Sequence, residues 1–274
     1  MSERPREPKI ITSLTNDRVK AIRALEMRKV RKETGLFVAE GASLLITARD
    51  NGFVPRTLVY QTGTADGGIT KGLVTWALKE GAEVLEVSAQ VLGKIASKDN
   101  PQTMLGVFCQ SFAGEPTAGE LREDQTWLAL EEVRDPGNLG TIIRTCDAVG
   151  VAGIMLVGNC CDPYSVESIR ATMGSIFCVP LIRMSLDAFM TRVADWPGDV
   201  IATDLKATED FRSARYGGPQ LVVMGSEGPG LSERLSQAAT RRVKIPMAGR
   251  LDSLNLAIAT ALTLYQIRWP HLKL

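Results

Sequence analysis

The fold of this chain is indicated most clearly by one stretch, Trp127-Leu-Ala-Leu-Glu-Glu-Val133 followed by Arg134-Asp-Pro-Gly-Asn138. The apolar run up to Val133 is typical of a buried strand, and the residues after the turn begin a helix that Gly150 can end. Further strand patterns, at 154–157, 200–203 and 221–224, alternate with helical ones, and a last helix begins at about Leu254. Such alternation predicts an α/β fold with a mostly parallel sheet covered by helices.

A smaller α/β domain is expected before this one. Asn16 is a plausible helix cap, and the spacing of Val19, Ile22 and Leu25 suits an amphipathic helix. A helical pattern over 42–48 and strand patterns at 36–39, 57–60, 83–87 and 105–110 follow. The turn-rich residues 112–119 then separate the halves. We therefore expect an N-terminal domain over 1–112, a linker over 113–124 and a C-terminal domain over 125–274.

Composition limits the function classes. The chain has 274 residues, and its 45% apolar and 23% charged residues are ordinary for a globular protein. It contains no apolar run of membrane-spanning length and no signal-peptide pattern, so we expect a cytoplasmic protein without a membrane partner. Five cysteines without a CxxC pair indicate reduced thiols. The single histidine, His271, argues against a Ser-His-Asp triad and against a metal site.

Charge is unevenly distributed along the chain. The net charge of the whole chain is only +1, whereas residues 1–32 carry ten basic and four acidic side chains, a local net charge of +6. Such a basic N-terminal arm is compatible with RNA binding, although a solvated helix face is at least as common an explanation.

The helix after Asn138 carries an arginine that core packing does not explain. Ile142, Cys146 and Val149 share one helical face, and Arg144 points roughly the opposite way. A solvated surface arginine would explain Arg144 if the segment stood alone. Asn138 would likewise be explained as an N-cap residue. A functional role for either residue depends on other segments of the chain.

A second polar segment, Gly225-Ser-Glu-Gly-Pro-Gly230, ends a strand pattern in three glycines. Glycines permit positive φ and a close approach of a ligand to backbone amides. The segment lacks the Lys-Ser/Thr of a Walker phosphate loop, and its spacing fails the GxGxxG dinucleotide pattern. Glu227 could accept hydrogen bonds from a ligand hydroxyl or amine, or it could stabilise a turn at a helix N-terminus.

The third segment runs from Ile245-Pro-Met to Ser253-Leu-Asn255, at the start of the last helix. Ser253 is plausible as an N-cap residue. Asn255 is harder to explain structurally, because a buried amide requires hydrogen-bond partners.

Together, Asp135-Pro-Gly-Asn138-x-Gly140-x-x-x-Arg144, Gly225-Ser-Glu227-Gly-x-Gly230 and Ile245-Pro-Met…Ser253-Leu-Asn255 resemble the three signature motifs of the SpoU-type RNA 2′-O-methyltransferases of the SPOUT superfamily. The resemblance covers residues 125–274, including the connecting segment with Arg170-Ala-Thr-Met-Gly174. More weakly, Ile11–Lys20 and Phe37-Val-Ala-Glu-Gly41 resemble the ribosomal-protein-like substrate-binding domain that precedes the catalytic domain in many members that act on ribosomal RNA.

The resemblance implies a deep C-terminal trefoil knot, a homodimer whose interface borders the S-adenosylmethionine site, and an RNA substrate. It implies donor-binding residues that act largely through backbone, namely Gly225, Ile245 and Leu254, with Thr203 nearby. It also implies a reactive centre formed by five residues, Asn138, Arg144, Glu227, Ser253 and Asn255.

The expected reaction is transfer of the sulfonium methyl group to a ribose 2′-hydroxyl. The family's usual assignment makes Arg144 the base, but a guanidinium has a pKa above about 12, so orienting the hydroxyl is physically easier. Ribosomal RNA is favoured as the substrate because of the N-terminal domain, and transfer RNA is the alternative. A non-catalytic ribosome-assembly factor and, more distantly, a nucleotide-dependent oxidoreductase are hypotheses from other classes.

Overall fold

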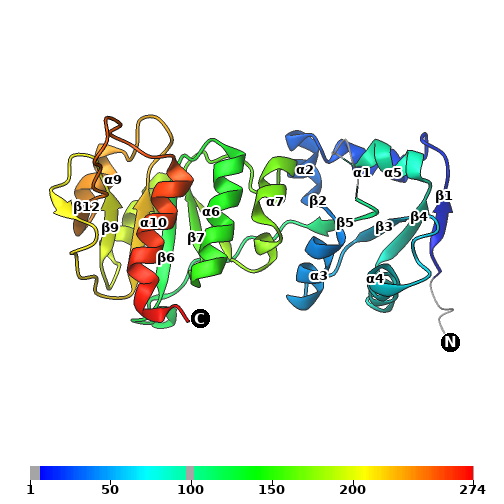
Figure 1. The fold of residues 1–274 in the computed structure, drawn as a ribbon, viewed down its shortest axis with the longest axis horizontal. Helices are drawn as coiled ribbons and strands as arrows, with labels where there is room; N and C mark the ends of the chain where they lie inside the picture. The colour runs from blue at the N-terminus through cyan, green and yellow to red at the C-terminus, as the bar shows by residue number, and fades with distance from the viewer. Residues whose placement is uncertain (1–6, 97–101, 274) are drawn as a thin grey trace. The chain divides into compact units, whose positions relative to one another are not determined.

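The computed structural model describes residues 7–96 and 102–273. It divides into two compact units. The N-terminal unit comprises the chain up to Gln110 together with Tyr164–Phe177, and the C-terminal unit comprises Ser111–Pro163 and the chain from Cys178. Figure 1 shows the helices and strands of both units. Arg4 and Arg6 of the basic arm lie outside the described residues.

In the N-terminal unit, the described strands form a mixed sheet with the order β1-β4-β3-β5-β2. β5 pairs antiparallel with β2 and β3, whereas β4 pairs parallel with β1 and β3. Helices α1 and α5 pack on one face of the sheet, and α3 and α4 pack on the other (Figure 1). The strands are β1 (Lys9–Ile11), β2 (Leu36–Glu40), β3 (Thr57–Gln61), β4 (Glu83–Val87) and β5 (Met104–Cys109), and the helices are α1 (Asp17–Ala24), α2 (Arg28–Thr34), α3 (Ala42–Asp50), α4 (Gly68–Lys79), α5 (Ala89–Ile95) and α7 (Val166–Thr172).

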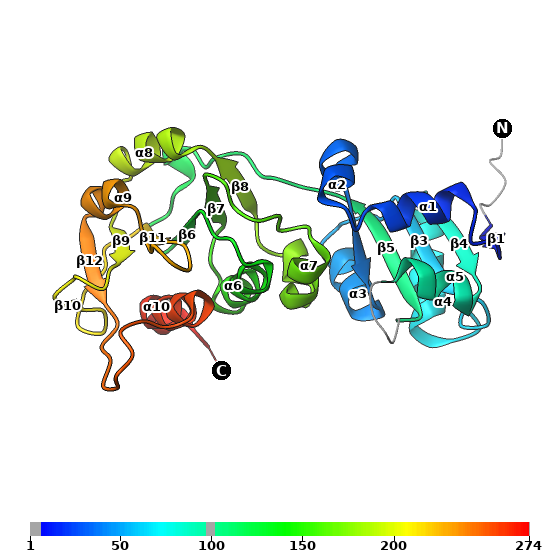
Figure 2. The same ribbon diagram turned by 90° about the horizontal axis from the view of Figure 1, so that it is seen from above.

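In the C-terminal unit, the described strands form one sheet with the order β10-β12-β9-β11-β6-β7-β8. Every pairing is parallel, which confirms the predicted sheet. Helices α6 and α10 lie on one face and α8 and α9 on the other (Figure 2). The strands are β6 (Thr126–Glu131), β7 (Ile154–Val157), β8 (Leu181–Met184), β9 (Val200–Thr203), β10 (Glu209–Asp210), β11 (Gln220–Met224) and β12 (Arg241–Lys244), and the helices are α6 (Pro136–Val149), α8 (Leu186–Ala194), α9 (Glu233–Ala238) and α10 (Leu256–Arg268).

The strand order brings distant segments to one edge of the sheet. β11 lies between β9 and β6, and β12 follows β9, so these strands end side by side although they are far apart in sequence. In parallel sheets, ligands bind beyond the carboxyl ends of such strands. The three polar segments all follow or border these ends. The deep trefoil knot that the resemblance implies stays a prediction.

Local capping explains where α6 and α10 begin. Asp135 caps α6, because its side chain accepts a hydrogen bond from Asn138 N at 2.6 Å. Asn255 caps α10 and accepts from Ala257 N and Ile258 N. The interpretations of Asn138 and Ser253 as N-cap residues are therefore wrong, and the last helix begins two residues later than predicted. Gly150 adopts φ 69° and ends α6 as expected.

Aromatic packing places the segment Tyr164–Phe177 with the N-terminal unit. The ring of Phe37 lies 4.6 Å from that of Tyr164 and 5.9 Å from that of Phe177, between ring centroids. The sequence-based division included this segment in the C-terminal domain over 125–274. The segment thus leaves one half of the sequence to complete the core of the other.

Within residues 7–96 and 102–273, no helix is long and apolar enough to cross a membrane. The same ranges contain no group of three or more His, Cys, Asp or Glu side chains placed to hold a metal ion.

Candidate functional site

A cavity of about 540 Å³ lies at the carboxyl ends of β9, β11 and β12, beside the first turns of α6 and α10. It has both polar and apolar walls and collects residues from all three polar segments. The cavity-lining residues that the sequence singled out are Asn138, Thr203, Gly225, Glu227, Ile245, Ser253, Leu254 and Asn255. The structure therefore brings together every predicted site residue except Arg144.

The loop after β11 requires a glycine at its first position. A Cβ atom on Gly225 would lie closer than 3.0 Å to the backbone of Gly230 and Leu231, a separation that real Cβ atoms essentially never show. Ser226 and Gly230 close the loop through two backbone hydrogen bonds of 3.1 and 3.2 Å. Gly230 itself adopts φ 74°, in the left-handed region. The close approach of the two loop ends fixes the shape of this cavity wall.

A chain of side-chain hydrogen bonds connects the three polar segments. Asn138 Nδ2 donates to Glu227 Oε1 at 3.1 Å, and Asn255 Nδ2 donates to Asn138 Oδ1 at 3.0 Å. Asn255 Oδ1 in turn accepts from the backbone at the start of α10. Asn138 and Asn255 thus each donate a hydrogen bond through the amide nitrogen and accept one through the amide oxygen. These hydrogen bonds fix the orientation of the three side chains jointly.

Glu227 is held as a carboxylate. Burial alone would raise its pKa, but hydrogen bonds from Arg134 N, Asn138 Nδ2 and Asp135 N outweigh burial and lower the pKa. The two backbone bonds measure 3.1 Å from Arg134 N and 3.3 Å from Asp135 N. These donors belong to the turn between β6 and α6, so the carboxylate also holds that turn against the β11 loop. At neutral pH, Glu227 can only accept hydrogen bonds.

Arg144 and Ser253 are less constrained. Arg144 is exposed on α6, opposite the buried residues Ile142 and Cys146, and it does not line the cavity. This confirms the predicted helical face but leaves the role of Arg144 untested. The Ser253 hydroxyl lies in the cavity wall and forms a hydrogen bond of 3.3 Å to Asp252 Oδ1.

Several lining residues were not predicted. Among them are charged or large apolar side chains close to the predicted ones, including Asp135, Asp204, Leu205, Met224, Lys244, Met247 and Asp252. Asp204 follows β9, which the sequence predicted, so its position at a strand end could have identified it. Lys244 ends β12, which the sequence did not predict. Burial would raise the pKa of Asp204, but hydrogen bonds from Lys206 N and Ser236 and the nearby Arg242 lower it.

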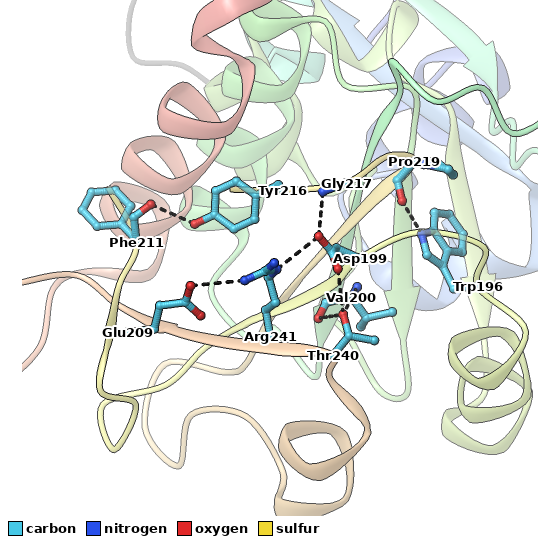
Figure 3. Close-up of polar contacts among 10 residues, drawn as sticks. All are labelled: Trp196, Asp199, Val200, Glu209, Phe211, Tyr216, Gly217, Pro219, Thr240 and Arg241. Carbon is cyan, nitrogen blue, oxygen red and sulfur yellow. Dashed lines mark hydrogen bonds and ion pairs between the residues drawn. The ribbon is translucent and has the colours of Figure 1, made fainter. Parts of the chain in front are cut away.

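A network at the opposite ends of β9 and β12 holds these two strands together (Figure 3). Arg241 bridges Asp199, with Nε to Oδ2 at 3.2 Å, and Glu209, with Nη1 to Oε1 at 3.2 Å. Asp199 also accepts from Gly217 N and Thr240 Oγ1. The network fixes the register of the strands whose far ends line the cavity.

The residues present fit the methyl donor that the resemblance implies. S-adenosylmethionine joins a flat apolar base to an amino acid and a cationic sulfonium. Leu205, Met224 and Leu254 offer apolar surface, and the carboxylates of Asp204, Glu227 and Asp252 offer hydrogen-bond acceptors and negative charge. The glycine loop exposes backbone groups to the cavity. The cavity thus has the chemistry that such a donor requires.

Comparisons with known proteins agree with this geometry. Residues 125–265 match the model of the SpoU rRNA Methylase family, and residues 16–106 match that of the MRM3-like substrate binding domain. An uncharacterized tRNA/rRNA methyltransferase of Synechocystis is 34% identical, over 94% of this chain and 93% of that protein. The 23S rRNA (guanosine(2553)-2′-O)-methyltransferase RlmP of Bacillus subtilis is 27% identical, over 95% of this chain and 99% of that protein.

Solved structures extend the similarity to the whole chain. An AdoMet-bound rRNA methyltransferase from Sinorhizobium meliloti is 43% identical with a TM-score of 0.88, over 97% of this chain and 99% of that one. The SpoU methyltransferase AviRb from Streptomyces viridochromogenes, in complex with AdoMet, is 26% identical with a TM-score of 0.79, over 93% and 98%. The predicted class of enzyme, an S-adenosylmethionine-dependent RNA 2′-O-methyltransferase, is confirmed. The chain belongs to the SpoU rRNA methylase family.

Proposed function

We propose that this chain methylates the ribose 2′-hydroxyl of a nucleotide in ribosomal RNA. The observation that carries the proposal is the hydrogen-bond chain Glu227–Asn138–Asn255, which ties the three motifs together at one cavity. RlmP, which is named as a 23S rRNA methyltransferase, and the match of the N-terminal unit to a substrate-binding domain support ribosomal RNA over transfer RNA.

The residues that would bind the methyl donor line the cavity at the ends of the strands. Thr203, Gly225, Ile245 and Leu254 line the cavity from three separate segments, after β9, β11 and β12, so they can contact different parts of the donor. Gly225 and Ile245 would contribute mainly backbone groups. S-adenosylmethionine supplies a methyl group already activated by its sulfonium, so the residues of the chain need only bind, orient and exclude water.

Glu227, Asn138, Asn255 and Ser253 would position the ribose. The ionised Glu227 and the two oriented amides present fixed acceptors and donors for ribose hydroxyls. Fixed dipoles of this kind need no reorganisation during the reaction. Arg144 would orient the 2′-hydroxyl and stabilise the negative charge that develops as its proton leaves. Its guanidinium stays protonated and is unsuited to act as the base.

We infer that the functional form is a homodimer. Ile258, Leu262, Tyr265 and Trp269 are spaced along one side of α10 and the turn that follows it, with exposed fractions between 42% and 71%. An apolar stripe of this kind favours burial against another chain. Because α6 packs against α10, the interface would border the helix that carries Arg144. A second copy of this chain is the occupant that the family resemblance supports.

The dimer is tested by light scattering coupled to gel filtration. Leu262→Glu should yield monomers, since it places a charge in the centre of the stripe, whereas Gln237→Glu on α9 should stay dimeric. A wild-type protein that is monomeric at all concentrations would contradict the inference.

The activity is tested with purified protein, S-adenosylmethionine carrying a labelled methyl group, and total RNA from cells that lack the gene. Wild-type protein should label ribosomal RNA at a ribose 2′-oxygen, and Asn138→Ala should label it far more weakly. Gln237→Ala, which changes an exposed amide on α9, is the control. Label confined to transfer RNA would favour the alternative substrate. RNA binding without any labelling would favour a non-catalytic assembly factor.

We also infer that the protein acts in the cytoplasm. The relatives named above are bacterial, and bacterial ribosomal RNA is made and assembled in that compartment. Cell fractionation with an antibody to the protein tests this.

A further inference from the structure

The N-terminal unit contains a second, smaller cavity that the methyl-transfer site does not use. Its volume is about 240 Å³, and it lies between the end of β2, the start of α3 and the α7 segment. All of its described lining residues belong to the N-terminal unit. The residues that matter for its chemistry are Glu40, Leu44, Gln102, Ile169, Arg170 and Met173.

The cavity combines apolar walls with one charge of each sign. Leu44 from α3 and Ile169 from α7 are buried and line it. The Glu40 side chain is only 7% exposed, and the Arg170 side chain is 36% exposed. Arg170 Nη2 lies 3.9 Å from Glu40 Oε2, so the two charges balance each other in one small space. Such a site suits a neutral ligand that has both donors and acceptors.

The rim of the cavity is shaped by unusual backbone. Met173 ends α7 in the left-handed region with φ 52°, and its side chain is 56% exposed. Left-handed backbone is uncommon for a residue other than glycine and often occurs at functional sites. Gly41, with φ 106°, lies beneath the Gln102 side chain, where a Cβ atom would be 3.4 Å from Gln102 Cγ. A large apolar side chain and an amide are therefore part of the cavity lining.

We propose that this cavity binds a guanine base. Guanine presents two adjacent N–H donors on its Watson–Crick edge, and O6 and N7 as acceptors. A carboxylate only accepts hydrogen bonds and has about four lone-pair positions, so Glu40 can receive both donors in addition to its existing partners. Arg170, with its donors only, matches O6 or N7. The apolar walls and Met173 would cover the faces of the ring.

The other bases fit this pair of charges less well. Adenine and cytosine place an acceptor nitrogen beside their exocyclic amine, and uracil places carbonyl oxygens on both sides of its single N–H. Each would direct an acceptor at the acceptor-only carboxylate of Glu40. The Glu40–Arg170 pair therefore favours guanine over adenine, cytosine and uracil.

The base could come from an unpaired guanosine in RNA or from a free guanine nucleotide. The RNA source rests on the proposed function, since specific RNA recognition mostly reads unpaired bases by stacking and by their hydrogen-bonding edges. In that case the N-terminal unit reads one guanosine of the substrate, while the C-terminal cavity holds the methyl donor. Arg170 belongs to the N-terminal unit, although it lies in the C-terminal half of the sequence.

The experiment compares the affinities of the full chain for short oligouridylates that carry a single guanosine, inosine or adenosine. Inosine lacks the 2-amino group, so it removes one donor without changing the ring. Wild-type protein should bind the guanosine oligonucleotide about 10- to 100-fold more tightly than the other two. This comparison needs no variant and so does not depend on how a substitution affects folding.

Glu40→Gln should abolish the preference for guanosine, because one acceptor oxygen becomes a donor that faces a donor of the base. Glu33→Gln, which alters a 60% exposed carboxylate in the same unit, should keep the preference. Titration with free GMP and AMP separates the two sources: tight binding of GMP without discrimination among the oligonucleotides would assign the cavity to a free nucleotide.

Equal binding of all three oligonucleotides, together with no preference for GMP over AMP, would overturn the proposal. So would a preference for guanosine that survives in Glu40→Gln. Methyl transfer to ribosomal RNA is measured in parallel on the wild-type protein. Its absence would count against the proposed function, whereas lost guanine discrimination with intact methyl transfer would count against this inference alone.

Discussion

Replacing Gly225 with alanine tests whether the loop after β11 forms the donor site. An added Cβ atom would overlap the backbone of Gly230 and Leu231, neither of which can rotate away as a side chain could. Non-bonded carbon atoms prefer separations of about 3.5–4.0 Å, so the two loop ends must separate by on the order of 1 Å. That movement would break the two hydrogen bonds between Ser226 and Gly230.

The size of the effect follows from those two bonds. Each contributes about 0.5–1.5 kcal/mol to stability, so restoring the loop around a bound donor would cost about 1–3 kcal/mol. Donor affinity should therefore fall about 5- to 150-fold. Isothermal titration with S-adenosylmethionine, and with its demethylated product, measures this directly.

Gly72→Ala on α4 is the control, because it does not line the cavity and has no heavy atom within 4 Å of its Cβ position. Its donor affinity should stay within about twofold of the wild type. Thermal unfolding of both variants shows whether the rest of the protein stays folded when donor affinity changes. Wild-type donor affinity in Gly225→Ala would refute the assignment of this loop to the donor site.

Three further substitutions test other parts of the site. Arg144→Lys should reduce methyl transfer by about 100-fold, because an ammonium cannot reproduce the fork of a guanidinium, while donor affinity is unchanged; wild-type turnover would contradict its proposed role. The pKa of Glu227 is lowered from 4.5 in the folded protein, so its contribution to stability is present above that value and lost as the pH falls through the lower folded pKa. The difference in unfolding free energy between wild type and Glu227→Gln should therefore be constant from about pH 6 to 8 and shrink below about pH 4, as measured by urea unfolding. Tyr216→Phe removes the hydroxyl that donates to Phe211 O at 2.8 Å. The substitution should lower the free energy of unfolding, measured with urea, by about 1 kcal/mol and leave donor affinity unchanged. A large loss of affinity would mean that the loop containing Tyr216 contacts the donor.

Sequence patterns predicted best those helices and strands whose own residues show a clear apolar pattern. The buried face of α6, with Ile142, Cys146 and Val149, follows from helical periodicity alone. The central strands of both sheets were found for the same reason, since runs of buried apolar residues mark them. The order of the three motifs also sufficed to predict the enzyme class.

Short strands at or next to a sheet edge were missed because their neighbours stabilise them. β12, Arg241-Arg-Val-Lys244, has one buried apolar residue and becomes a strand through pairing with β9 and β10. β1 at the edge of the N-terminal sheet is even shorter and has the exposed Ile10 at its centre. Such segments carry little apolar periodicity of their own.

The sequence by itself determined which residues form the strands β9 and β11 and the helices α6 and α10 beside the cavity, and which polar segments border it, because apolar periodicity and turn residues act over a few neighbours. Only the tertiary structure decided what each polar side chain does. Asp135 and Asn255 cap the helices, and Asn138 is thereby left to connect Glu227 with Asn255 across 89 and 117 residues of sequence. A hydrogen bond depends on distance and direction in space, and the strand order, which local pattern does not encode, sets both.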